Sequence, residues 1–117
     1  MRQHAITEWP AGLAHPVGVV ELEPRELERR CGVHFSESYD DLDRLLGAIV
    51  ETVHGGTFAL VRHLGAGRRG TEVWVHEDSN NPRADLTTAL DTLALDESAL
   101  TWVSPAATSR GGQANSF

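Results

Sequence analysis

Hydrophobic residues recur with helical spacing in the middle of the chain, between residues 42 and 53. Their intervals of three and four residues are typical of the buried face of a helix about three turns long. Upstream, Ser38 and Asp41 are spaced like a capping box, and acidic residues favour a helix N-terminus. We therefore predict a helix that ends at Gly55-Gly56, with a buried face formed by Leu42, Leu45, Leu46, Ile49, Val50 and Val53.

Two stretches of β-branched and alternating residues flank a glycine-rich segment. Residues 57–64 (TFALVRHL) and 71–77 (TEVWVHE) have the composition of strands, and residues 65–70 (GAGRRG) are a short connection between them. An antiparallel hairpin is the simplest topology for so short a connection. In the register that we predict, His63 lies opposite Glu72 on one face of the hairpin.

The remaining elements are shorter. Residues 17–23 end in an alternating pattern that predicts a strand. Pro24 suits the first turn of a short helix that Gly32 would end, and Asn81, followed by a proline, would cap a further helix. That further helix would bury Leu86, Ala89, Leu90 and Leu93. Two smaller elements are predicted as well: a strand or extended connection at 33–36 and a strand at 101–103.

The order of these elements predicts an α+β fold. Strands and helices alternate, but the hairpin requires antiparallel pairing, so the economical solution has two layers. We expect a mostly antiparallel sheet with two to three helices packed on one face. Residues 16–103 would form this single domain, preceded by an irregular N-terminal arm at 1–15 and followed by a flexible C-terminal tail at 104–117.

Length and composition agree with one globular domain. The chain has 117 residues, of which 40% are hydrophobic, enough for a core without disulfides. All ten basic residues are arginines, which indicates a GC-rich genome and suggests a bacterial source. The single cysteine, Cys31, and the absence of an apolar leader or membrane-length segment predict a cytoplasmic protein with no membrane partner.

The charge balance restricts the class of partner. Seventeen acidic residues against ten basic ones give a net charge of −7, which disfavours binding to the phosphate backbone of a nucleic acid. The same charge would suit a protein with a basic surface. An unpaired sheet edge would also allow a symmetric homodimer.

Motifs for catalysis, cofactors and metals are absent from the sequence. The six histidines include no pair at the i, i+4 spacing of a helical zinc site, and Cys31 has no second cysteine with which to bind a metal. The glycine-rich segment 65–70 lacks the lysine of a phosphate-binding loop, and no G-x-S-x-G motif occurs. We therefore predict no cofactor and no metal, and we favour a non-catalytic protein.

Two functional hypotheses remain. The first is a protein-interaction module of accessory, immunity or adaptor type, which binds a basic partner through an acidic surface assisted by exposed arginines. Its candidate partner-binding residues are Glu21, Glu23, Glu26, Glu28, Asp40, Asp41, Asp43, Arg68 and Arg69. The alternative is a small ligand-binding domain or enzyme with its site on the hairpin face, formed by Arg62, His63, Glu72 and His76.

Overall fold

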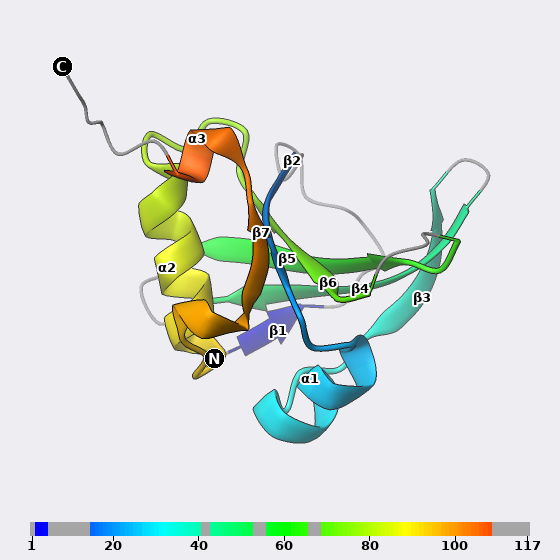
Figure 1. The fold of residues 1–117 in the computed structure, drawn as a ribbon. Helices are drawn as coiled ribbons and strands as arrows, with labels where there is room; N and C mark the ends of the chain where they lie inside the picture. Colours follow the sequence, from blue (N-terminus) through cyan, green and yellow to red (C-terminus); the bar gives the residue numbers. More distant parts are fainter. Residues whose placement is uncertain (1, 5–14, 41–42, 53–55, 66–68, 109–117) are drawn as a thin grey trace, which may run out of the picture.

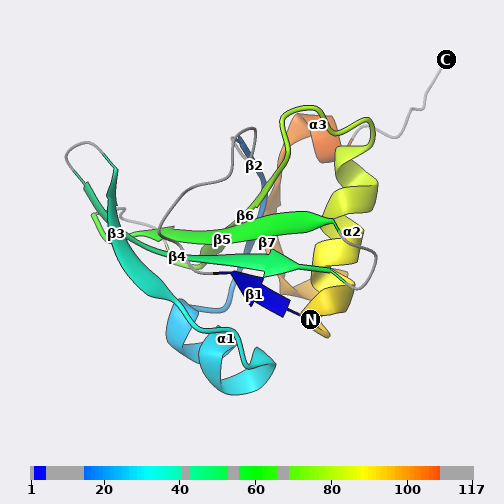
Figure 2. The same ribbon diagram turned by 180° about the vertical axis from the view of Figure 1, so that it is seen from behind.

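The computed structural model describes residues 2–4, 15–40, 43–52, 56–65 and 69–108. In these ranges the chain has an α+β fold, with three helices and a seven-stranded antiparallel sheet (Figures 1 and 2). The elements are β1 (Arg2–His4), β2 (His15–Val20), α1 (Pro24–Cys31), β3 (Ser36–Asp40), β4 (Asp43–Glu51), β5 (Thr57–His63), β6 (Thr71–Val75), α2 (Pro82–Thr92), a 3-10 turn (Glu97–Ala99), β7 (Leu100–Val103) and α3 (Pro105–Thr108). The strand order is β1-β4-β5-β6-β2-β7, with β3 also paired to β4.

One apolar core lies between the sheet and the helices. Helix α1 contributes Leu27, α2 contributes Leu86 and Leu90, and α3 contributes Ala107. Successive side chains of a strand project from opposite faces, so one face of the sheet, at β2, β4, β5 and β6, enters this core. The sheet contributes Val17, Val20, Ala48, Val50, Phe58, Leu60, Val73 and Val75. The predicted α+β architecture with helices packed on the sheet is therefore confirmed.

The predicted central helix is wrong, because Asp43–Glu51 form strand β4, which pairs with β3 as a hairpin. Leu42 and Val53 of the predicted buried face lie outside the described residues. Asp40 pairs with Asp43 at the end of this hairpin, so these aspartates do not lie at a helix start. Strand β4 also pairs with β5, and its middle is buried on both faces, with Ile49 on one and Ala48 and Val50 on the other. A strand buried on both faces carries a nearly continuous apolar run, which imitates helical spacing.

The two shorter helices begin as the sequence predicts. Helix α1 starts at Pro24, and Gly32 ends it with a left-handed φ of 76°. Asn81 caps α2, because its side-chain oxygen accepts a hydrogen bond from the amide of Ala84 at 3.1 Å. The buried stripe predicted for α2 is confirmed as well.

The β5–β6 hairpin is confirmed, but its register differs from the predicted one by two residues. Val61 lies opposite Glu72, where the sequence pattern had placed His63. A shift of two residues leaves every side chain on its own face, since the side-chain period of a strand is two. His63 and Glu72 therefore remain on the same face of the sheet, offset from each other by two residues along the strands.

Both ends of the described chain contain structure that the sequence pattern did not predict. Residues 2–4, within the predicted irregular arm, pair with β4 as strand β1, and β2 already begins at His15. The predicted flexible tail begins instead with α3, in which Ala107 is fully buried. The rest of the arm (5–14) and of the tail (109–117) lies outside the described residues.

Candidate functional site

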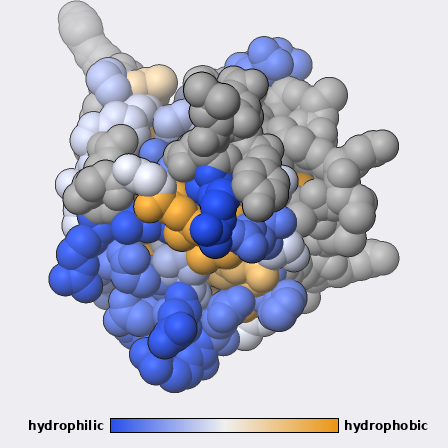
Figure 3. Space-filling model, turned by 90° about the vertical axis from the view of Figure 1, so that its right-hand side faces the viewer, coloured by the Kyte–Doolittle hydropathy of each residue, from blue (hydrophilic) through white to orange (hydrophobic). Residues whose placement is uncertain are grey.

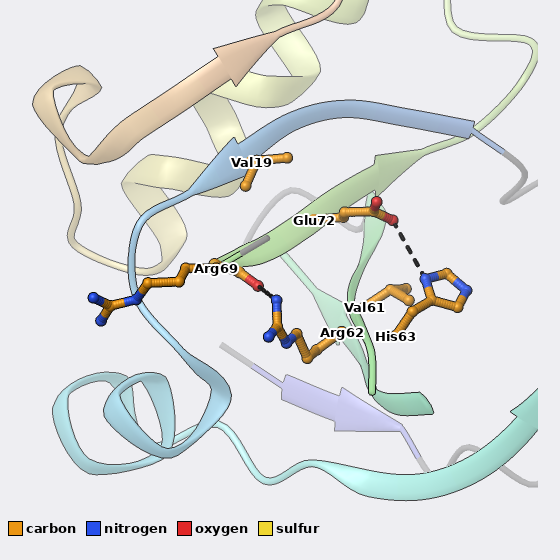
Figure 4. A pocket seen from close by; sticks show the side chains of 7 residues that line it. Val19, Val61, Arg62, His63, Arg69 and Glu72 are labelled. Atoms are coloured by element: carbon orange, nitrogen blue, oxygen red, sulfur yellow. Dashed lines mark hydrogen bonds and ion pairs between the residues drawn. The ribbon is translucent and has the colours of Figure 1, made fainter. Parts of the chain in front are cut away.

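Three of the four residues predicted for a ligand site come together where β5 leads into the hairpin loop. His63 and Glu72 face each other, with 3.9 Å between His63 Nδ1 and Glu72 Oε1, and Arg62 is next to them (Figure 4). His76 is not part of this group. It follows β6, four residues beyond Glu72, a distance of about 13 Å along an extended strand. Its ring lies against Asp78 instead, at 3.8 Å.

These residues line a small hollow on the face of the sheet. Its empty volume is ≈ 240 Å³, part of which is open solvent, and its lining also includes Val19, Val61, Arg69 and Gly70. Pockets that enclose a drug-sized ligand are usually about 300–1,000 Å³ and deeper. Glu72 also accepts a hydrogen bond from the indole nitrogen of Trp74 at 2.8 Å. The hollow has room for water or a small ion, and its acidic group is already engaged within the protein.

Arg62 serves mainly to join the hairpin to the start of α1. One of its guanidinium nitrogens donates to the carbonyl oxygen of Gly70 at 3.2 Å, and another lies 3.7 Å from a carboxylate oxygen of Glu23. The amide of Gly70 donates to the other carboxylate oxygen of Glu23, and the hydroxyl of Thr71 donates to the carbonyl of Leu22 at 2.8 Å. This network fixes the base of the loop against α1, so Arg62 has a structural role.

The acidic residues predicted to bind a partner do not form one surface. Glu23, Glu26 and Glu28 accept hydrogen bonds from backbone amides, those of Gly70, Glu23 and Phe35 respectively. Glu21 is exposed. Asp40 and Asp43 lie at the end of the β3–β4 hairpin, which both ribbon views place away from α1 (Figures 1 and 2). Arg69 is exposed, whereas Asp41 and Arg68 lie outside the described residues.

Exposed carboxylates gather instead around α2, where the sequence pattern did not predict a site. Six acidic residues between positions 77 and 97 are all exposed, and Arg83 is the single basic residue in that segment. The segment therefore has a net charge of −5, out of −7 for the whole chain. We call these six residues the α2 acidic surface: Glu77, Asp78, Asp85, Asp91, Asp96 and Glu97. Charge counting along the printed sequence could have located it.

One carboxylate of this surface, that of Asp96, keeps its negative charge to lower pH than an unperturbed carboxylate does. Hydrogen bonds from the side chain and the backbone of Ser98 lower the pKa of Asp96. Asp96 therefore stays ionised when unperturbed carboxylates begin to take up protons.

Metal and membrane features are both lacking in the part of the chain that the structure describes. No three His, Cys, Asp or Glu side chains there converge as metal ligands. No helix in the described ranges combines the length and the apolar character needed to cross a bilayer.

Cys31 has an environment that suppresses its reactivity. Burial raises the pKa of its thiol, an effect that the charge of Arg30 only partly offsets, and its sulfur donates to the carbonyl oxygen of Leu93 at 3.2 Å. Only the thiolate is a good nucleophile. We therefore expect the native protein to react with an aromatic disulfide reagent at pH 8 more slowly than free cysteine does. The rate should recover in denaturant, and equal rates for native protein and free cysteine would contradict the structure.

No family model matches the chain, no curated protein matches its sequence, and no solved structure matches its fold. Its function is therefore inferred from the chain's own residues.

Proposed function

We propose that this protein is a non-catalytic interaction module that binds a basic partner protein through the α2 acidic surface. The observation that carries the proposal is the concentration of charge: one helix and its flanks hold six exposed carboxylates and a net charge of −5. An accessory, immunity or adaptor role in the cytoplasm of a bacterium is the biological setting that we propose for it.

The packing of α2 explains how the surface is presented. Leu86 and Leu90 are buried against the sheet, so the opposite side of the helix faces solvent with Asp85 and Asp91. The turn before the helix and the turn after it add carboxylates at both ends. Ion pairs on an exposed surface are individually weak, but several carboxylates on and beside one helix attract an extended basic surface together.

The ligand-site alternative has less support. Arg62 and Glu72 are engaged within the protein, His76 lies elsewhere, and the hollow beside them is small. A catalytic constellation would need a polar group aimed at a space that can hold a substrate. Among its described residues, the hairpin face lacks a space of that size. The exposed carboxylates of the α2 acidic surface therefore support protein binding better than the hairpin face supports catalysis.

Titration with a labelled octa-arginine peptide tests the proposal. The test variant removes three α2 carboxylates that make no hydrogen bond within the described residues: Glu77→Gln, Asp78→Asn and Asp91→Asn. The charge-matched control removes three acids elsewhere in the chain: Glu21→Gln, Glu37→Gln and Glu51→Gln. We expect the dissociation constant, measured by fluorescence anisotropy at low salt, to rise about tenfold for the test variant and about twofold or less for the control.

The control also distinguishes a located surface from general attraction to an acidic protein. Both variants have the same net charge, so long-range attraction changes equally in the two. Equal weakening by the two variants would therefore remove the α2 acidic surface from the proposal.

A further inference from the structure

Four exposed arginines lie on and beside α1, on a protein with an overall negative charge. They are Arg25, Arg29, Arg30 and Arg69, and we call them the α1 arginine surface. Within the described residues, none of the four makes a hydrogen bond or an ion pair. The paired arginines are elsewhere: Arg44 contacts Glu37, Arg62 contacts Glu23, and Arg83 contacts Glu97 at 2.6 Å.

The fold brings these four residues to one end of the molecule. Arg25 and Arg29 are one helical turn apart, and Arg30 is adjacent. Arg69 precedes Gly70, whose amide donates to Glu23 at the start of α1. The side chain of Arg69 extends away from His63 on the side where α1 lies (Figure 4). In the view that brings this side forward, the lower part of the surface, where α1 lies, is hydrophilic (Figure 3).

The acidic and basic side chains of α1 and its N-cap differ in exposure, although their numbers in the sequence are equal. Residues 23–30 contain three glutamates and three arginines. The glutamates accept hydrogen bonds from backbone amides, and they are only partly exposed, whereas all three arginines are exposed. The guanidinium groups are therefore more exposed to solvent than the carboxylates of the same segment, although the sequence is neutral.

Helix stability accounts for only part of this arrangement. Arg29 and Arg30 are in the last turn, where positive charge interacts favourably with the helix dipole. Arg25 is in the first turn, where the same dipole disfavours it, and it is one turn from another positive charge. Arg69 is not on the helix at all. The helix dipole therefore does not account for the positive charge of Arg25 or of Arg69.

We propose that the α1 arginine surface binds a carboxylate-rich segment of a partner protein. Guanidinium groups pair with carboxylates through two parallel hydrogen bonds, and an unpaired exposed guanidinium is free to do so. A long nucleic acid fits less well, because its backbone would also pass the carboxylates that give the chain its net charge of −7. A short acidic segment can meet the arginines alone. This surface is separate from α2 and goes beyond the function proposed above.

The test uses a labelled octa-glutamate peptide and two double variants of the full chain. One removes unpaired arginines (Arg25→Gln, Arg29→Gln), and the control removes paired ones (Arg44→Gln, Arg83→Gln). Both change the net charge equally. By anisotropy at low salt, we expect about tenfold weaker binding for the first variant, and about twofold or less for the control. Equal weakening would overturn the proposal.

Three further readouts separate binding of an acidic segment from a role in stability, RNA binding or self-association. The single variant Arg25→Gln should weaken binding while its Tm stays equal or rises, and a fall in Tm with unchanged binding would contradict the proposal. Tighter binding of a single-stranded RNA octamer than of octa-glutamate would also overturn it. So would light scattering that shows the unmodified chain self-associating through these arginines, since the surface would then be occupied by a second copy.

Discussion

Replacement of Gly70 by alanine is expected to destabilise the protein by about 3 kcal/mol or more. Gly70 has a φ of 102°, which an L-residue rarely adopts, and an added Cβ would lie 2.4 Å from the carbonyl oxygen of Val20 and 3.0 Å from Val19 Cγ1. The backbone of β2 cannot move aside without breaking its pairing with β6. Urea unfolding monitored by circular dichroism measures the loss as a lower midpoint at an unchanged slope.

Gly32→Ala is the matched control for this prediction. Gly32 also has a positive φ, of 76°, but nothing lies within 4 Å of the position of its Cβ. Its substitution adds only the conformational penalty, about 1 kcal/mol. Similar losses for the two variants would show that β2 does not lie against Gly70 as described.

The second large effect is expected for Leu60→Ala, with a loss of about 3 kcal/mol. Leu60 is fully buried on β5, between β4 and β6, and its removal would leave a cavity in the main core. Leu64, four residues later, has 41% of its surface exposed, so Leu64→Ala should cost less than about 1 kcal/mol.

The same unfolding experiment compares the two leucine variants directly. A loss for Leu64→Ala as large as that for Leu60→Ala would mean that Leu64, just beyond the end of β5, is buried and not exposed as described. Because both substitutions remove the same atoms, differences in side-chain chemistry do not enter the comparison.

The elements that sequence reasoning located correctly are those with local signals. Proline at the first helical turn, glycine after the last and asparagine at the cap fixed α1 and α2, because each acts within a few residues. Strand β4 lacked such a signal. Its burial on both faces depends on partners distant in sequence, which a local apolar period cannot reveal.

The candidate site was only partly predictable for the same reason. The sequence correctly placed His63 and Glu72 on the same face, where they are close together, although the predicted register was wrong. A shift of two residues leaves each side chain on its own face. The hydrogen-bond partners of the glutamates of α1 could not be predicted from the sequence. Glu28 accepts from the amide of Phe35, and Glu23 accepts from Gly70, a contact across 47 residues of chain. At α1, the sequence therefore did not reveal which charged side chains are fully exposed and which are engaged by backbone amides.

The resulting molecule has exposed charge of opposite sign at two places. Exposed carboxylates lie on and beside α2, and exposed arginines without an ion pair among the described residues lie on α1, although both helices pack on the same core. Two such surfaces would allow one small domain to contact two partners, or two parts of one partner, through complementary charge.

Affinity capture from the native cell lysate tests the central claim, that the α2 acidic surface recruits a basic partner. The baits are the unmodified protein, the α2 variant (Glu77→Gln, Asp78→Asn, Asp91→Asn) and its matched control, each at low and moderate salt, with recovered proteins identified by mass spectrometry. We expect a stoichiometric basic protein on the unmodified and control baits, released by moderate salt and absent from the α2 variant. Recovery of the same proteins on all three baits, or of none, would contradict the claim.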